Sequence, residues 1–157
     1  MITLQNEDGV TRQIARKSLV AVGKPAVPSL RRTLRASTLD HVRWEAVKTL
    51  DAIGDIRAIP SLVTALEDSD ADVVWSAAEA LRKFKKAAWP VLLRALIRRG
   101  ADSVLLRQGA HHVLRNQREA GFNDLLKNLR DAIESGSVPE STMVAANELL
   151  KRMRTTP

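Results

Sequence analysis

The chain has 157 residues, of which 45% are hydrophobic and 3% aromatic, enough apolar material for one domain that folds without a metal or a disulfide. It contains no cysteine, which excludes disulfides, thiolate nucleophiles and cysteine metal sites. No run of about 18 apolar residues occurs, and the first residues lack a basic segment followed by an apolar one. We therefore expect a cytoplasmic protein without membrane association.

The net charge of +7 is unevenly distributed along the chain. Residues 1–36 and 71–100 each contain seven Lys or Arg against two Asp or Glu, whereas residues 37–70 contain three against seven. A positive surplus favours an acidic partner. Because an acidic block separates two basic ones, the pattern argues against one continuous basic stripe.

One pattern occurs three times along the chain: Ala, an apolar residue four positions later, then Pro, and Leu two and six positions after the Pro. The three copies are residues 15–34, 46–66 and 77–96, anchored on Leu19, Leu50 and Leu81. A fourth copy is anchored on Val113, with Gly109 in the place of the alanine. Anchor spacings of 31, 31 and 32 residues are typical of a stacked solenoid.

Each copy predicts two helices, because its apolar residues recur at the spacing of one helix face. Gly23 and Gly54 are expected to end first helices, and the prolines at 28, 60 and 90 to begin second helices. Asp40 and Asp72, or polar residues near them, are expected to cap first helices. The predicted helices are residues 10–22, 26–36, 41–53, 57–68, 72–85, 87–99, 103–116, 121–135 and 140–153.

The predicted fold is all-α, with one domain over residues 1–157 that contains about four helix pairs and a terminal capping helix. The repeats lie at about 10–36, 41–68, 72–99 and 103–135, and the capping helix lies at 140–153. This last helix repeats the pattern of two small residues followed by leucine, with Ala145, Ala146 and Leu149. It follows a longer connection, Ser135–Pro139, and a single terminal helix of this kind typically caps an array.

The segment VRWEAVKTLDAIGDIRAIPSLVTALEDSD, Val42–Asp70, contains an Ala-Ile-Gly-Asp turn followed by the proline. With its neighbours it resembles the HEAT-repeat superfamily over residues 10–153, most closely the short repeats of phycobilisome lyase subunits and many bacterial proteins. The segment RQGAHHVL, Arg107–Leu114, is similar to free-standing bacterial HEAT-repeat proteins. The resemblance implies a right-handed α-α superhelix of the HEAT and armadillo type. It also implies a scaffold that binds proteins on the concave face, which the second helices line.

Two adjacent histidines, His111 and His112, raise the question of a metal or catalytic site. On a helix their rings diverge by about 100°, whereas a metal-binding pair needs a spacing of four residues. We therefore interpret them as a structural pair at the edge of the helix packing, with a partner contact as the alternative. HEAT-like hydroxylases bind iron through His-Glu dipeptides, and the sequence contains none.

The run Asp68–Glu79 places acids at calcium-loop positions, but Val73 stands where such a loop requires glycine. We interpret this run as a turn between repeats whose aspartates cap the next helix. The sequence therefore predicts no metal and no cofactor.

Cations stand four or seven positions after Pro28 and Pro90 and after the corresponding point of the fourth copy, on the helices that the resemblance assigns to the concave face. The predicted partner-binding cations are Arg31, Arg32, Arg35, Arg94, Arg98, Lys127 and Arg130, and Glu67 and Asp68 interrupt them. Trp44 and Trp75 occupy one position of successive first helices, with Arg107 next in that position. They predict either packing at the margin of the core or an exposed partner-binding strip, with Arg107 over an indole ring.

The sequence contains no glycine-rich phosphate loop, nucleophile elbow or triad spacing. We interpret the chain as a non-catalytic scaffold that binds an acidic protein partner on a rigid basic surface. Two alternatives stay open. One is binding to a nucleic-acid backbone, similar at fold level to HEAT-like DNA glycosylases, and the other is assistance in pigment attachment, similar to phycobilisome lyases.

Overall fold

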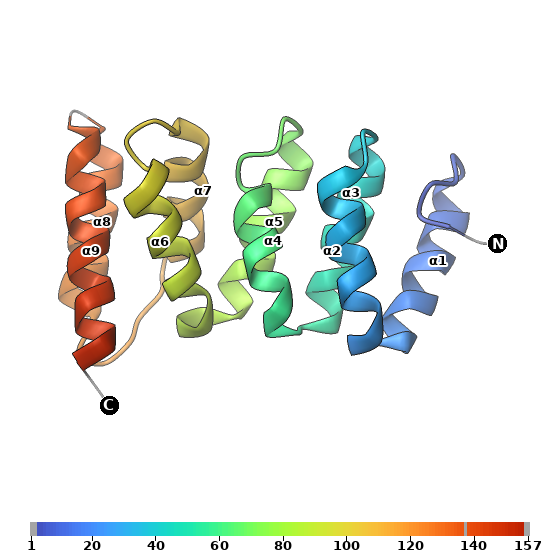
Figure 1. Ribbon diagram of the computed structural model, residues 1–157, viewed down its shortest axis with the longest axis horizontal. Coiled ribbons are helices and arrows are strands. Elements are labelled where there is room, and N and C mark those ends of the chain that lie inside the picture. The colour runs from blue at the N-terminus through green and yellow to red at the C-terminus, as the bar shows by residue number, and fades with distance from the viewer. Residues whose placement is uncertain (1–2, 137, 156–157) are drawn as a thin grey trace. The chain divides into compact units, whose positions relative to one another are not determined.

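The computed structural model describes residues 3–136 and 138–155, and within them every regular element is helical (Figure 1). The all-α class predicted from the sequence is confirmed. The helices are α1 (Gly9–Val22), α2 (Val27–Ala36), α3 (Asp40–Ile53), α4 (Ile59–Ala65), α5 (Ala71–Lys83), α6 (Trp89–Arg99), α7 (Val104–Leu114), α8 (Asn123–Ser135) and α9 (Pro139–Thr155). The chain divides into two compact units, Met1–Ala80 and Leu81–Pro157, with the boundary inside α5. Ser137, in the predicted connection Ser135–Pro139, lies outside the described residues.

The turns between first and second helices follow from glycine and proline. Gly23 and Gly54 end α1 and α3 with φ angles of 71° and 66°, which glycine adopts without a steric penalty. The 3₁₀ turns Lys24–Ala26 and Ile56–Ala58 follow these glycines. A proline then stands within the first two positions of α2 and α4. N–H groups at these positions have no partner within the helix, so the missing N–H of proline costs no hydrogen bond. Both turn predictions are confirmed.

Lys85 holds the place of these glycines in the third repeat. It lies four positions after Leu81, as Gly54 does after Leu50, and its φ angle is 49°. A residue with a Cβ atom is strained in this left-handed region. The 3₁₀ turn Lys85–Ala88 and α6 nevertheless follow in the same order as in the other repeats. We infer that helix packing imposes the turn on the lysine.

Aspartates near helix starts bond to backbone amides, but at other positions than those first expected. Asp70 Oδ1 accepts hydrogen bonds from the backbone N–H groups of Asp72 and Val73, at 3.0 Å each, and so caps α5. Asp72 instead lies inside the first turn, where its charge complements the helix dipole. Asp40 likewise lies inside the first turn of α3, whose N-cap residue Leu39 makes no side-chain capping bond. The predicted alternative, a polar residue near Asp72 as the cap of α5, is confirmed in Asp70, whereas the prediction that Asp40 caps α3 is wrong.

In the first unit, α3 packs against α1 and α2, and α2 also packs against α4. The alanine positions of the repeat are enclosed, with Ala15 and Ala46 only 3% and 0% exposed. The anchor Leu50 is fully buried, whereas Leu19 on the first helix is half-buried. Larger side chains at the alanine positions would push the helices apart, because interaxial distance depends on the side chains at the contact.

A buried carboxylate joins α1 to α3. Glu45 is 3% exposed, and its Oε2 accepts a hydrogen bond from Arg16 Nη1 at 2.7 Å. Arg12 Nε lies 3.6 Å from Oε1 of the same carboxylate. Burial of a charged group costs free energy unless opposite charges compensate it, so the two arginines of α1 make the burial of Glu45 tolerable.

In the second unit, α7 packs against α6 and α8, and α9 packs against α8 and α6. Figure 1 shows α9 beside α6, with α8 behind α9. The repeat pattern assigns the place beside α6 to α8, as the second helix of the fourth repeat. This assignment is corrected: α9 occupies that place, and α8 lies against α7 and α9.

The connection between α7 and α8 explains the position of α8. It spans eight residues, Arg115–Phe122, and Asn116 and Gly121 within it have φ angles of 63° and 80°. Phe122 is buried, and its ring packs edge-on against the ring of Trp89 with centroids 6.1 Å apart. Trp89 is buried as well and therefore acts as a packing residue. The ring contact holds the connection at the start of α6 and brings the start of α8 to that point.

We expect Gly54→Ala and Lys85→Gly to change stability in opposite directions. A Cβ atom added at Gly54 meets nothing within 4 Å, so the cost is conformational, and the free energy of unfolding should fall by about 1 kcal/mol. Lys85→Gly relieves strain and should raise that free energy by up to about 1 kcal/mol. Urea denaturation of the full chain measures both. A change of the same sign in both variants would contradict the interpretation of Lys85.

Glu45→Ala should lower the free energy of unfolding by about 2 kcal/mol, because Arg16 loses a charged hydrogen bond at a buried contact. The control is Asp131→Ala, which breaks an exposed ion pair with Lys127 Nζ at 2.6 Å. This control should cost less than about 0.5 kcal/mol. Thermal and urea denaturation provide the comparison, and equal losses would mean that burial does not strengthen the Glu45 contacts.

Candidate binding site

The predicted cations of α2 differ in their surroundings. Arg32 and Arg35 are exposed, and neither side chain makes a hydrogen bond or an ion pair with the residues that the structure describes. Arg31 is half-buried, and its Nε donates a hydrogen bond to Ser61 Oγ of α4 at 3.0 Å. Arg31 therefore joins two second helices, whereas Arg32 and Arg35 face solvent.

Acidic residues lie next to this basic helix, as the sequence predicts. Arg35 lines a hollow of about 350 Å³ whose lining also includes Arg43, Glu67 and Asp68. The guanidinium of Arg43 binds both carboxylate oxygens of Asp68, with Nε and Nη2 at 2.8 Å. This fork-to-fork ion pair neutralises Asp68. The hollow is therefore of mixed charge and does not favour an anion over a cation.

The two predicted tryptophans have different environments although they share a repeat position. Trp44 is half-buried, with the Arg16 guanidinium 5.9 Å and Lys48 Nζ 5.8 Å from its ring centroid. These distances suit cation–π contacts. Trp75 is 59% exposed. Trp44 thus belongs to the packing between α1 and α3, whereas Trp75 presents an accessible indole.

Arg107 stabilises a turn, and its expected place over an indole ring stays a prediction. Its Nη1 donates hydrogen bonds to the carbonyl oxygens of Gly100 and Ala101, the latter at 2.9 Å. Arg12 and Arg43 do the same near their own helix starts, where each donates to carbonyls of the preceding turn. Carbonyls in such turns lack helical partners, and the arginines satisfy them.

The remaining predicted cations lie on two helices of the second unit. Arg94 and Arg98 are exposed on α6, without a hydrogen bond or an ion pair to any described residue. Lys127 is exposed on α8 and paired with Asp131, while Arg130 is half-buried and its Nη1 lies 3.5 Å from the carbonyl oxygen of Leu114. Because α8 lies against α7 and α9, these two pairs of cations do not stand on neighbouring second helices.

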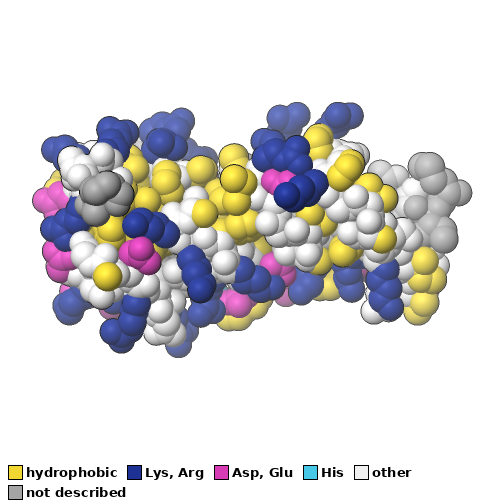
Figure 2. Space-filling view, turned by 90° about the horizontal axis from the view of Figure 1, so that it is seen from below, with side chains coloured by type: hydrophobic (Ala, Val, Ile, Leu, Met, Phe, Trp, Pro, Cys, Tyr) yellow, Lys and Arg dark blue, Asp and Glu magenta, His cyan; other side chains and the backbone are white. Residues whose placement is uncertain are grey.

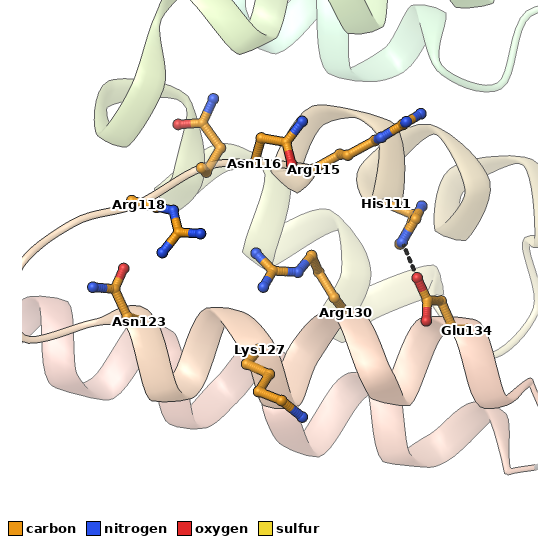
Figure 3. A pocket seen from close by; sticks show the side chains of 9 residues that line it. His111, Arg115, Asn116, Arg118, Asn123, Lys127, Arg130 and Glu134 are labelled. Atoms are coloured by element: carbon orange, nitrogen blue, oxygen red, sulfur yellow. Dashed lines mark hydrogen bonds and ion pairs between the residues drawn. The ribbon is translucent and has the colours of Figure 1, made fainter.

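Arg130 lines a cavity of about 440 Å³ between α7, α8 and the start of their connection (Figure 3). One wall is a single face of α8, since its lining residues are spaced by four, three and four positions. The opposite wall is the end of α7 and the chain that follows it. The lining residues are His111, Arg115, Asn116, Gln117, Arg118, Asn123, Lys127, Arg130 and Glu134.

The charge in this cavity is strongly positive. Its lining contains four Lys or Arg side chains and one carboxylate, Glu134. Figure 3 shows the guanidinium groups of Arg118 and Arg130 turned toward each other and the Lys127 ammonium turned away. Arg118 is exposed and makes no ion pair or hydrogen bond within the described chain. Two like charges that face each other without a carboxylate between them favour an anion in that space.

The histidines lie at the edge of the helix packing, as the sequence predicts. Both are half-buried, and His111 Nε2 lies 2.7 Å from Glu134 Oε1 across the cavity. This contact joins α7 to α8 and occupies the one carboxylate of the cavity lining. No group of three or more metal-ligating side chains occurs within residues 3–136 and 138–155.

Sequence reasoning missed Arg115 and Arg118, because they lie in a connection that has no equivalent repeat position. It identified Lys127 and Arg130 through their positions in the fourth copy of the repeat. Asn123 and Glu134 lie four positions before Lys127 and four after Arg130, so helical periodicity places all four residues on one face of a helix. This periodicity could have predicted one wall of the site. The opposite wall depends on how the connection folds, and no periodic pattern encodes that.

Two overlapping parts of the chain, residues 2–82 and 32–115, match the family described as HEAT repeats. The resemblance to that superfamily is confirmed over these residues, and the second match ends where the unusual connection begins. A comparison with curated proteins gives no match. Across the described helices, none combines the length and the apolar character that crossing a bilayer requires.

Proposed function

This chain belongs to the HEAT-repeat family, and we propose that it is a non-catalytic scaffold that binds an acidic protein partner through exposed arginines. HEAT repeats suggest protein interaction, and domains of this kind are usually non-catalytic. Stacked helices form a preorganised surface, so little conformational entropy is lost on binding.

The proposal of an acidic partner rests on a set of exposed arginines whose charges are not neutralised by an ion pair within the described chain. Arg32 on α2 and Arg94 and Arg98 on α6 are solvated and make no ion pair with the described side chains. Other arginines are engaged inside the fold, as Arg16 is by Glu45. An arginine that no carboxylate neutralises adds to the surface potential, which steers and orients an acidic partner.

A nucleic-acid backbone is the second candidate, and the charge distribution favours it less. On the face drawn in Figure 2, Lys and Arg side chains gather in separate groups, with apolar and acidic side chains between them. A nucleic acid presents a regular row of phosphates and is matched best by a continuous basic path. The likeness to phycobilisome lyases stays a prediction, which visible absorbance on mixing with a bilin and an acceptor protein would test.

The proposal is tested by reversing the charge of Arg32, Arg94 and Arg98 to glutamate in one variant. Partners are recovered from nuclease-treated lysate at several salt concentrations and identified by mass spectrometry. Each exposed charge contact contributes about 0.2–1 kcal/mol, so the triple variant should bind an acidic partner roughly three- to 150-fold more weakly. Recovery of the partner should also decrease as salt rises.

The matched control reverses three exposed cations outside the predicted set: Lys17, Lys151 and Arg154. It has the same net charge as the test variant and should retain the partner. Equal recovery with both variants would refute the role of the α2 and α6 arginines. Loss of the ligand on nuclease treatment, with a log-log salt slope of about −3.6 for four phosphates, would instead support nucleic-acid binding.

A further inference from the structure

The cavity between α7 and α8 is preformed, because its most irregular wall is held at several points. Gln117 donates a backbone hydrogen bond to the carbonyl oxygen of Leu114 at 3.0 Å and a side-chain hydrogen bond to that of Arg82 at 3.2 Å. Further along, Lys86 Nζ lies 3.2 Å from Glu119 Oε1. These contacts, which flank Arg118 in the sequence, fix the backbone from which Arg118 extends.

The left-handed conformation of Asn116 belongs to the same wall. Asparagine tolerates a positive φ angle better than most residues, and here φ is 63° at the exit from α7. The chain therefore turns directly after Arg115. This turn places the segment that leads to Arg118 opposite the face of α8 that contains Arg130 (Figure 3).

Two guanidinium groups in the cavity, those of Arg118 and Arg130, have no carboxylate partner within the described chain and can bind an anion. The Glu134 carboxylate is occupied by His111, and the Lys127 ammonium by Asp131, at 2.7 Å and 2.6 Å. Arg130 makes one long contact of 3.5 Å to a backbone carbonyl, and Arg118 makes none with the described residues. An anion placed between Arg118 and Arg130 would therefore receive charged hydrogen bonds without breaking a strong pair.

The shape and chemistry of the cavity restrict the ligand. A cavity of about 440 Å³ accepts a small molecule or one modified side chain. Guanidinium forks match the oxygens of a tetrahedral phosphate, which can accept from two arginines at once. No Phe, Tyr or Trp ring lies among the described lining residues, and the one imidazole, of His111, contacts Glu134. The amides of Asn116, Gln117 and Asn123 suit polar groups.

We propose that this cavity binds a phosphate monoester between Arg118 and Arg130. The proposal goes beyond the scaffold function, because it assigns a small-ligand site away from the α2 and α6 arginines. The phosphate belongs either to a small metabolite or to a phosphorylated side chain of a protein, and both present the same dianion to the two arginines.

The test titrates inorganic phosphate into the full chain at low salt, followed by calorimetry and by NMR shifts of the arginine side chains. Saturable binding is expected, with shifts at Arg118 and Arg130. Arg118→Gln and Arg130→Gln should each weaken binding at least about tenfold, because each removes charged hydrogen bonds to the anion. Arg118→Lys should bind with intermediate affinity, since it retains the charge and loses the fork.

The matched control is Arg98→Gln, which removes one exposed cation from α6 of the same unit and should change the affinity less than about twofold. Circular dichroism checks that all variants are folded. The proposal is overturned if phosphate does not saturate, if Arg98→Gln weakens binding as much as Arg118→Gln, or if acetate binds as tightly as phosphate.

A second arm distinguishes the two sources of the phosphate. Glycerol phosphate and a short peptide containing phosphoserine are compared with inorganic phosphate on the same chain. Tighter binding of the peptide identifies a modified side chain, tighter binding of glycerol phosphate identifies a small metabolite, and both support the site. Arg118→Gln should still recover the protein partner of the scaffold, so a failure here is distinguishable from a failure of the scaffold proposal.

Discussion

The close approach of α1 and α3 is the constraint on which the packing of the first unit depends. Ala15 and Ala46, which share one position of the repeat, are both buried. Because helix separation is set by the side chains at the contact, small residues at this position allow the two helices to pack closely. The corresponding residues of the next two repeats, Ala77 and Gly109, are small and buried as well.

The turns show that this packing is stronger than local preference. Glycine accommodates the left-handed residue in two repeats, but Lys85 adopts the same conformation in the third. Arginines at the starts of first helices bind carbonyls of the preceding turn, as Arg12 and Arg107 do. These arginines hold the turns between repeats. The turn at Lys85 lies inside a repeat and is contacted instead by the connection after α7, where Gln117 donates to the carbonyl oxygen of Arg82 and Glu119 pairs with Lys86.

The sequence predicted the helices and their buried faces because helical periodicity and turn residues are local signals. It did not predict the position of α8, which depends on a contact between Phe122 and Trp89, 33 residues apart. The candidate site divides in the same way. Arg130 was found from its position in the repeat, whereas Arg118 lies in an irregular connection whose path is set by tertiary contacts. The family match also ends at this connection.

Net charge alone does not separate the two roles that arginine has in this chain. Arg16 compensates a buried carboxylate, and Arg43 neutralises an aspartate, so neither adds much to the external field. Arg94 and Arg118 have no such partner among the described residues, and their charge is directed to solvent or to a cavity. A repeat scaffold can use the first group to hold its helices together. Under the two proposals made above, the second group provides the charges that recognise an anion, on α2 and α6 for the acidic partner and in the cavity for the phosphate.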